Sequence, residues 1–308
     1  MKLLAALLFV SGVVMVSQAV VSEANAQSTM PLLSADSAMQ VSPHVYAMIG
    51  FPNIAIVVGD RATLVVDTGM GTRNGATVLR EAEKLSKKPK LFLTTTHFHP
   101  EHAMGVDAFP ADTILIRPTV QQQEMDQRKD EFIQMFSKMS AQNKELLTGL
   151  KLRTPDLLFD REVKLDLGGV TSRLFWLGTA HTRGDEMIFV EQDSVLIPGD
   201  IVQSKLVPNM PNDDTSPKNW IAILDQLAPL KPRFVVPDHG ALGDGSLITQ
   251  ERAFLVDVQT KSLELKRKGT PVDEAGKLVA TEMKTKYPDW NSMGSIANIV
   301  KRVYAEAQ

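Results

Sequence analysis

The sequence predicts an α/β fold, because short strand-like runs and helix-like stretches alternate along most of the chain. Hydrophobic residues make up 44% and charged residues 22% of the 308 residues, which is typical of a globular protein. The net charge is −3 and no run of five like charges occurs, so we expect no nucleic-acid partner. A small-molecule substrate is the expected partner.

The first 26 residues read as a secretory signal peptide. Lys2 precedes an apolar stretch of about 14 residues, which is too short to span roughly 30 Å of hydrocarbon comfortably. Ala24 and Ala26 form a small-residue cleavage site that would release a chain starting near Gln27. We therefore expect a periplasmic or secreted protein with no stable membrane association after cleavage. An uncleaved membrane anchor is the alternative.

The chain contains no cysteine. Disulfides, thiolate metal ligands and a cysteine nucleophile are therefore excluded. Any metal ion must bind to nitrogen and oxygen atoms.

The first half of the mature chain predicts strands and one helix. Strands are expected at residues 45–49, 54–58 and 63–66, with residues 59–61 as a hairpin turn, and again at 90–96. The helix between the last two strands has one apolar face, formed by Val78, Leu79, Ala82 and Leu85.

The second half repeats this pattern. Strand character covers residues 163–167, 172–177 and 187–197 and returns at 234–236. Ser216 and Pro217 fit the cap and the first position of a helix that carries Trp220, Ile223, Leu224 and Leu227.

Two segments stand outside the alternation. Residues from about 119 to 150 predict a helical insertion, whose apolar residues indicate either ordinary core or a pliable wall or lid over a site. Residues 246–308 predict a C-terminal extension of three helices. The catalytic domain is accordingly expected at residues 27–245.

Three of the six histidines fall in one short segment, His97-Phe-His99-Pro-Glu101-His102, directly after a predicted strand. In an extended stretch His97 and His99 point to the same side, so both imidazoles can reach one cation. Pro100 then turns the chain and carries Glu101 and His102 towards a second position nearby. The segment therefore predicts a metal site.

Three further candidate ligands follow other strand-like runs: His181, Asp200 and His239. Loops at strand ends can converge on one edge of a sheet, where α/β folds place their sites. His44 is the sixth histidine, and we interpret it as a surface or packing residue.

With these motifs in this order, the sequence resembles the metallo-β-lactamase superfamily from about Val41 to Gly240. The resemblance implies a four-layer αββα sandwich with a dinuclear metal site at one edge. It implies that His97, His99 and His181 bind the first metal ion. Glu101, His102 and His239 occupy the positions of the second metal's ligands. Asp200 matches the bridging carboxylate, and Asp67 matches an aspartate that supports the ligands.

Such a ligand set suits Zn²⁺, two ions per chain, with manganese or iron as alternatives. Water bound to zinc loses its proton near pH 7, so a hydroxide held by the metals is the expected nucleophile. The resemblance gives Glu101 and Asp200 catalytic roles. Glu101 stands where the family has aspartate and is one methylene longer, which leaves a single bound metal ion as an alternative.

We therefore expect an exported hydrolase that cleaves an ester-, thioester-, lactone- or amide-like bond of a small molecule. A β-lactamase is the alternative, although Asp200 disfavours it, and a mononuclear iron oxygenase of the persulfide-dioxygenase type is a further one. Arg183 and Lys205 follow two of the motifs and could bind a substrate anion, or could simply be solvated surface charges.

Overall fold

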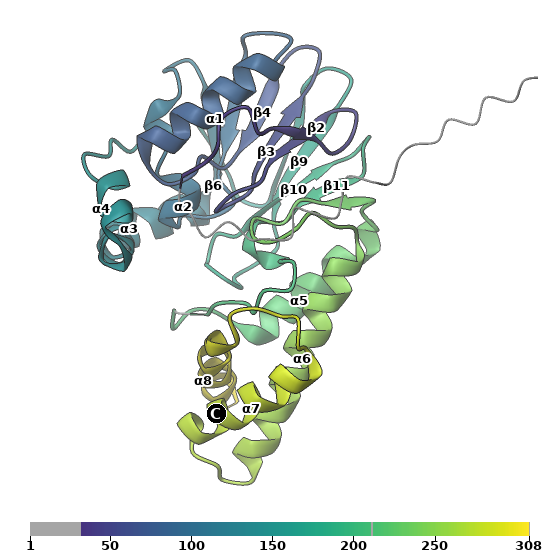
Figure 1. Cartoon of the computed structure of the whole chain (residues 1–308). Helices are drawn as coiled ribbons and strands as arrows, with labels where there is room; N and C mark the ends of the chain where they lie inside the picture. Colours follow the sequence, from purple (N-terminus) through teal and green to yellow (C-terminus); the bar gives the residue numbers. More distant parts are fainter. Residues whose placement is uncertain (1–31, 211, 308) are drawn as a thin grey trace, which may run out of the picture.

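Two β-sheets form the centre of the protein (Figure 1). The structure is a computed structural model that describes residues 32–210 and 212–307, so the predicted signal peptide lies outside the described residues. Among the described residues the first sheet has seven strands, whose spatial order follows the chain: β1 (Met39–Gln40), β2 (Val45–Met48), β3 (Ile54–Val58), β4 (Thr63–Val66), β5 (Leu91–Thr94), β6 (Ile114–Pro118) and β7 (Leu157–Phe159).

The second sheet has the order β12-β11-β10-β9-β8. Its strands are β8 (Glu162–Asp166), β9 (Thr171–Trp176), β10 (Glu186–Val190), β11 (Val195–Ile197) and β12 (Phe234–Val235). In the first sheet β1 to β4 pair antiparallel and β4 to β7 pair parallel, whereas in the second only β11 and β12 are parallel.

The core between the sheets follows from the alternation of side chains along each strand. On β3, Ala55 and Val57 face the second sheet, while Ile54, Ile56 and Val58 face outwards. The inner faces meet in one cluster that includes Leu64, Val66, Leu174, Ile188, Val190 and Val195. Because both faces of these strands are buried, the runs are apolar throughout rather than alternately polar.

Helices cover the outer face of each sheet. Helix α1 (Gly71–Leu85) packs Val78 and Ala82 against the outer face of the first sheet. Helix α5 (Pro217–Leu227) packs Trp220 against the second, and Ser216 caps it by accepting a hydrogen bond from the Asn219 N–H, as predicted. The αββα sandwich is thereby confirmed.

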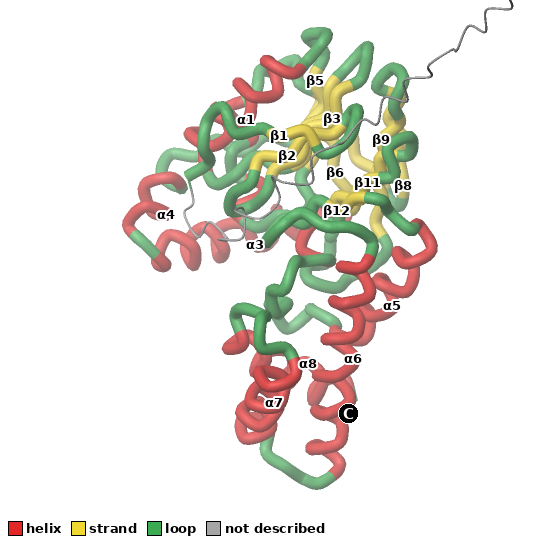
Figure 2. The backbone as a smooth tube through the Cα atoms, turned by 45° about the vertical axis from the view of Figure 1, so that its right-hand side comes forward, coloured by secondary structure: helices red, strands yellow, loops and turns green. Residues whose placement is uncertain are grey.

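The helical insertion and the C-terminal helices are also present. The insertion comprises α3 (Thr119–Met139) and α4 (Ala141–Leu146), and the extension comprises α6 (Ser246–Arg267), α7 (Val272–Lys286) and α8 (Ile296–Glu306). Figure 2 shows α6, α7 and α8 projecting away from the sheets. Phe254 of α6 stacks on Trp290, which lies between α7 and α8 in the sequence, with ring centroids 4.4 Å apart. Of the described helices, none is long and apolar enough to cross a membrane.

The strand predictions need correction in two places. The run at 187–197 is not continuous, because residues 191–194 turn the chain between β10 and β11 and Ser194 adopts a φ of +53°. Strands β1, β6 and β7 were not predicted. Strands β1 and β7 have only two and three residues, and β6 ends in proline, so their sequences carry little periodic signal.

Candidate metal centre

The seven predicted ligands follow the carboxyl ends of four strands at one edge of the sandwich. Helix α2 (Pro100–Ala103) begins shortly after β5, and the 3₁₀ turn η2 (Gly199–Ile201) directly follows β11. His181 lies between β9 and β10, and His239 lies beyond β12. All seven side chains are buried: His97, His99, Glu101, His102, His181, Asp200 and His239.

The first group brings together His97, His99 and His181, whose ligand atoms lie within 4.8 Å of one another. His99 Nδ1 and His181 Nε2 are 3.2 Å apart. The Nδ1 atom of His181 lies 2.9 Å from the Asn209 carbonyl oxygen, which fixes the ring so that Nε2 faces the group.

The second group consists of Glu101, His102 and His239, again with ligand atoms within 4.8 Å. Pro100 opens α2, and this helical turn brings Glu101 and His102 beside the first group, as predicted. The two groups are therefore adjacent.

Asp200 lies between the two groups. Its Oδ2 atom is 3.3 Å from His181 Nε2, and its Oδ1 atom is 3.2 Å from His239 Nε2 and 3.9 Å from His102 Nε2. This is the position that a carboxylate bridging two cations would take.

The unpaired buried atoms at this edge fit metal ions. His97 Nε2, His102 Nε2 and Glu101 Oε2 have no hydrogen-bond partner among the described residues, although each is shielded from water. Leaving such groups unpaired costs about 1–3 kcal/mol each, so a cluster of them calls for a ligand. The imidazole and carboxylate set matches what divalent transition metals bind.

Burial controls the charges of the histidines. Desolvation holds the pKa values of His97 and His99 well below the usual range, and it lowers the pKa of His239 to about 4. Neutral imidazoles are the form that binds a metal ion. Burial acts in the same direction on His102, but Asp67 and Asp238 outweigh it and raise the pKa of His102.

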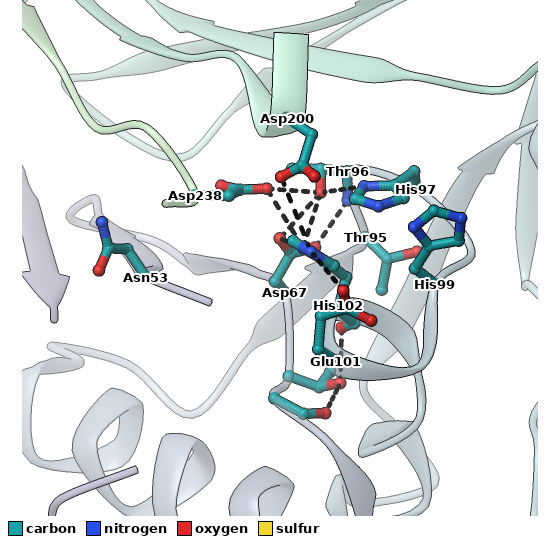
Figure 3. A network of polar contacts seen from close by, with 12 residues as sticks. Asn53, Asp67, Thr95, Thr96, His97, His99, Glu101, His102, Asp200 and Asp238 are labelled. Atoms are coloured by element: carbon teal, nitrogen blue, oxygen red, sulfur yellow. Dashed lines mark hydrogen bonds and ion pairs between the residues drawn. The ribbon is translucent and has the colours of Figure 1, made fainter. Parts of the chain in front are cut away.

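Asp67 lies behind the second group, where its Oδ2 atom is 2.9 Å from His102 Nδ1 (Figure 3). The resemblance predicted such a supporting contact. Asp238 was not predicted, yet its Oδ2 atom lies 3.2 Å from the same nitrogen. Its position directly before His239 was the only signal in the sequence. Thr96 was likewise missed, and its hydroxyl touches both carboxylates.

Each loop of the second sheet is held by a specific contact. Asp185 accepts hydrogen bonds from the N–H and hydroxyl of Thr182, next to His181. Gly199, with a φ of +62°, packs so closely on Thr96 that a Cβ atom there would lie 2.9 Å from the threonine's Cβ. The amide of Asn53 donates to the carbonyls of Pro237 and Gly240 on either side of His239.

Helix α3 lies directly against the first group. The Phe132 ring stacks on His99 with centroids 4.6 Å apart and an interplanar angle of 19°. Phe132 is buried, whereas Met139 at the end of the same helix is 61% exposed. On the other side, the Phe51 ring lies 4.6 Å from that of His239. Apolar rings therefore border the centre on both sides.

The two candidate substrate anchors are paired elsewhere. Arg183 Nε lies 2.6 Å from Asp214, and Lys205 Nζ lies 2.5 Å from Asp289. His44 lies away from the centre and contacts Asp193 at 2.8 Å, which agrees with its interpretation as a packing residue.

Comparison with known proteins agrees with this geometry. The sequence model described as "Metallo-beta-lactamase superfamily" matches residues 48–239. A curated relative, the linear primary-alkylsulfatase of Pseudomonas sp. (strain ATCC 19151), is 23% identical over 250 residues, which cover 68% of this chain and 46% of the relative. The chain thus spans about half the length of that relative.

Among solved structures, the sec-alkylsulfatase Pisa1 from Pseudomonas sp. superposes with a TM-score of 0.67 and 18% identity, covering 88% of this chain and 50% of that one. A metallo-beta-lactamase from Pontibacter korlensis has a TM-score of 0.55 and 20% identity, covering 71% of this chain and 98% of that one. The alkylsulfatase fold therefore matches more of this chain, including part of the C-terminal helices.

Proposed function

Because this chain belongs to the metallo-beta-lactamase superfamily, we propose that it is an exported metal-dependent hydrolase that cleaves an ester-like bond of a small molecule. The observation that carries the proposal is the convergence of two adjacent groups of buried imidazoles and carboxylates, with Asp200 between them. Several of their ligand-competent atoms have no other partner among the described residues.

The two groups would each hold one cation. His97, His99 and His181 form the first site, Glu101, His102 and His239 form the second, and Asp200 contributes to both. Zinc is the proposed metal, because imidazole nitrogens and carboxylate oxygens suit zinc well, with manganese or iron as alternatives. When bound, the metal lowers the pKa of a coordinated water from 15.7 to about 7 and so supplies a nucleophile at neutral pH.

The carboxyl group of Glu101 is placed to move a proton. In the metal-free protein burial raises the pKa of Glu101 to about 7. A carboxyl group with a pKa near the working pH can both release and return a proton. Besides its proposed role as a ligand of the second cation, Glu101 is therefore the proposed proton carrier for the leaving group.

Sulfate esters are the first substrate class to test. One alkylsulfatase is similar to this chain in sequence and another in fold, and the structural match to the second extends beyond the sandwich. The apolar rings of Phe132 and Phe51, which border the centre, suit an aliphatic chain on the ester. A β-lactam is the second candidate, supported by the likeness to the Pontibacter enzyme.

The test is metal analysis combined with activity assays on alkyl sulfates, carboxylic esters, thioesters, lactones and a β-lactam. We expect turnover by the wild type, and loss of it in His97→Ala and Asp200→Ala. His44→Ala is the matched control, because it removes a histidine outside the centre. Undiminished turnover in the first two variants would reject the mechanism. Bound iron with oxygen uptake on a persulfide would instead establish the oxygenase alternative.

A further inference from the structure

The Thr96 hydroxyl lies between a histidine of each group. Its Oγ atom is 3.2 Å from His97 Nδ1 and 3.3 Å from His102 Nδ1. Figure 3 draws both contacts, which meet at the threonine hydroxyl. The two rings are themselves adjacent, with centroids 4.0 Å apart.

The Nδ1 atoms of His97 and His102 need hydrogen-bond acceptors when the Nε2 atoms bind cations. Nε2 of each ring is buried and has no partner among the described residues, so Nε2 is the atom free to bind a cation. Each Nδ1 atom must then carry a hydrogen and donate it. For His97 the acceptor that the structure provides is Thr96 Oγ.

Two carboxylates complete the arrangement. Thr96 Oγ is 2.8 Å from Asp238 Oδ2 and 2.9 Å from Asp67 Oδ2. The same two oxygens are 3.2 and 2.9 Å from His102 Nδ1. Two donors, the hydroxyl and the His102 N–H, therefore face two acceptors, and all four side chains are buried. Removing either donor would leave a buried carboxylate oxygen short of a hydrogen bond.

We infer that Thr96 and Asp238 are positioning residues that couple the two proposed cation sites through the Nδ1 atoms of His97 and His102. The inference rests on the proposed metal centre. A cation on His97 fixes that ring with its N–H on the threonine oxygen, which directs the threonine's own hydrogen to a carboxylate. The carboxylate pair then orients His102. Filling one site thus favours the geometry that the other site needs.

Asp238 also ties this network to a third ligand. It directly precedes His239, and its backbone carbonyl accepts a hydrogen bond of 2.7 Å from the Asn53 N–H. One loop therefore carries a ligand of the second group and the carboxylate that orients another. Displacing Asp238 would disturb both.

The test measures the stepwise zinc affinities of the metal-free protein by competition with a chelating dye. Thr96→Val keeps the shape of the side chain and removes the hydroxyl. We expect both affinities to fall about tenfold or more, the usual cost of losing a contact behind a metal ligand, and Thr96→Ser to restore them. Thr95→Val is the matched control: Thr95 is equally buried, but its hydroxyl contacts Gln121 and Arg117.

Asp238→Asn provides an independent variant and closes a double-mutant cycle. If the two residues act through each other, Thr96→Val combined with Asp238→Asn costs less affinity than the sum of the single losses. Additive losses, or a Thr96→Val variant that binds as tightly as Thr95→Val, would overturn the coupling. If the wild type binds only one cation, the coupling is overturned but the proposed function is not. A wild type that binds none would overturn the proposed function as well.

Discussion

The two sheets contribute to the centre in different ways. The first sheet supplies four ligands from a single segment, residues 97–102, which follows β5 and folds into one helical turn. The second sheet supplies three ligands, His181, Asp200 and His239, each from a separate loop. The geometry of the first set is local, because six consecutive residues determine it. That of the second set depends on contacts between residues far apart in the sequence.

The supports of the second set illustrate this dependence. Asp185 holds the His181 loop within the second sheet, but Thr96 limits the approach of the Asp200 loop and Asn53 holds the His239 loop, both from the first sheet. The second set is therefore positioned largely by the opposite half of the sandwich. The difference can be tested by variants that address one set at a time.

The largest expected effect is the loss of a ligand from either set. His97→Ala and His181→Ala should each lower kcat/KM about a thousandfold, because a bound cation contributes several kcal/mol to the transition state and each 1.36 kcal/mol is a factor of ten. Steady-state kinetics on the best substrate measures this. If His181→Ala kept its activity while His97→Ala lost it, the second sheet would not contribute to the centre in the way proposed.

The next largest effect concerns the insertion, which holds the His181 loop through Glu124. Oε2 of Glu124 on α3 accepts a hydrogen bond from the Arg183 N–H, and burial raises the pKa of Glu124 from 4.5 to about 7. Between these values the folded protein binds a proton that the unfolded chain releases, so the free energy of unfolding falls as the pH rises through this range.

Glu124→Gln should remove that dependence. Relative to the wild type, the metal-free variant should gain up to about 3 kcal/mol at pH 8 and nothing at pH 4. Urea denaturation at both pH values measures the gain, and Glu131→Gln, on the exposed side of the same helix, is the control. An equal gain at pH 4 and pH 8 would show that titration of Glu124 is not the cause.

A smaller effect is expected when a supporting hydrogen bond is removed, and it compares the supports of the two ligand sets directly. Asn53→Ala removes the two side-chain hydrogen bonds to the His239 loop and leaves the backbone bond to Asp238. It should lower the affinity for the second cation about tenfold. Thr68→Val removes the hydroxyl bond to the His102 carbonyl and the bond that the hydroxyl accepts from the Gly105 N–H, but the backbone bond from the Thr68 N–H and the turn of α2 remain. It should therefore change the affinity less. Equal losses in a zinc titration would contradict the contrast between the sets.

The smallest effect is expected for the histidine outside both sets. His44→Ala loses a partly exposed contact with Asp193 and should cost about 1 kcal/mol of stability or less. Its zinc stoichiometry and turnover should equal those of the wild type. A change in either would mean that the β1–β2 loop influences the centre.

Sequence periodicity predicted most elements but not all of them. The β-branched runs at β2, β3 and β4 and the capped helix α5 carry strong local signals and were found where expected. The turn between β10 and β11 was missed, although the four polar residues 191–194 interrupt the apolar run at 187–197 and are a turn signal. Strands β6 and β7 exist because neighbouring strands pair with them, which a short segment does not reveal by itself.

The candidate site divides in the same way. The histidine-rich segment was recognisable from spacing alone, and the places of His181, Asp200 and His239 after strand-like runs indicated that they join it. Which metal ion each of them binds relied on the family resemblance. Their roles as ligands remain predictions. Asp238, Asn53 and Asp185 were not identified, because a buried aspartate or asparagine has no distinctive spacing before its partners are known. Phe132 was missed because its contact with His99 crosses between two elements.

The sequence by itself determined the residue types of the centre, the local turn that presents Glu101 and His102, and the apolar runs that build the two sheets. These depend on short-range geometry, which neighbouring residues specify. Only the tertiary structure decided that two carboxylates meet one imidazole, that a threonine hydroxyl lies between ligands of both groups, and that α3 closes one side. Such contacts form when the sandwich packs, because burial from water makes each polar partner necessary.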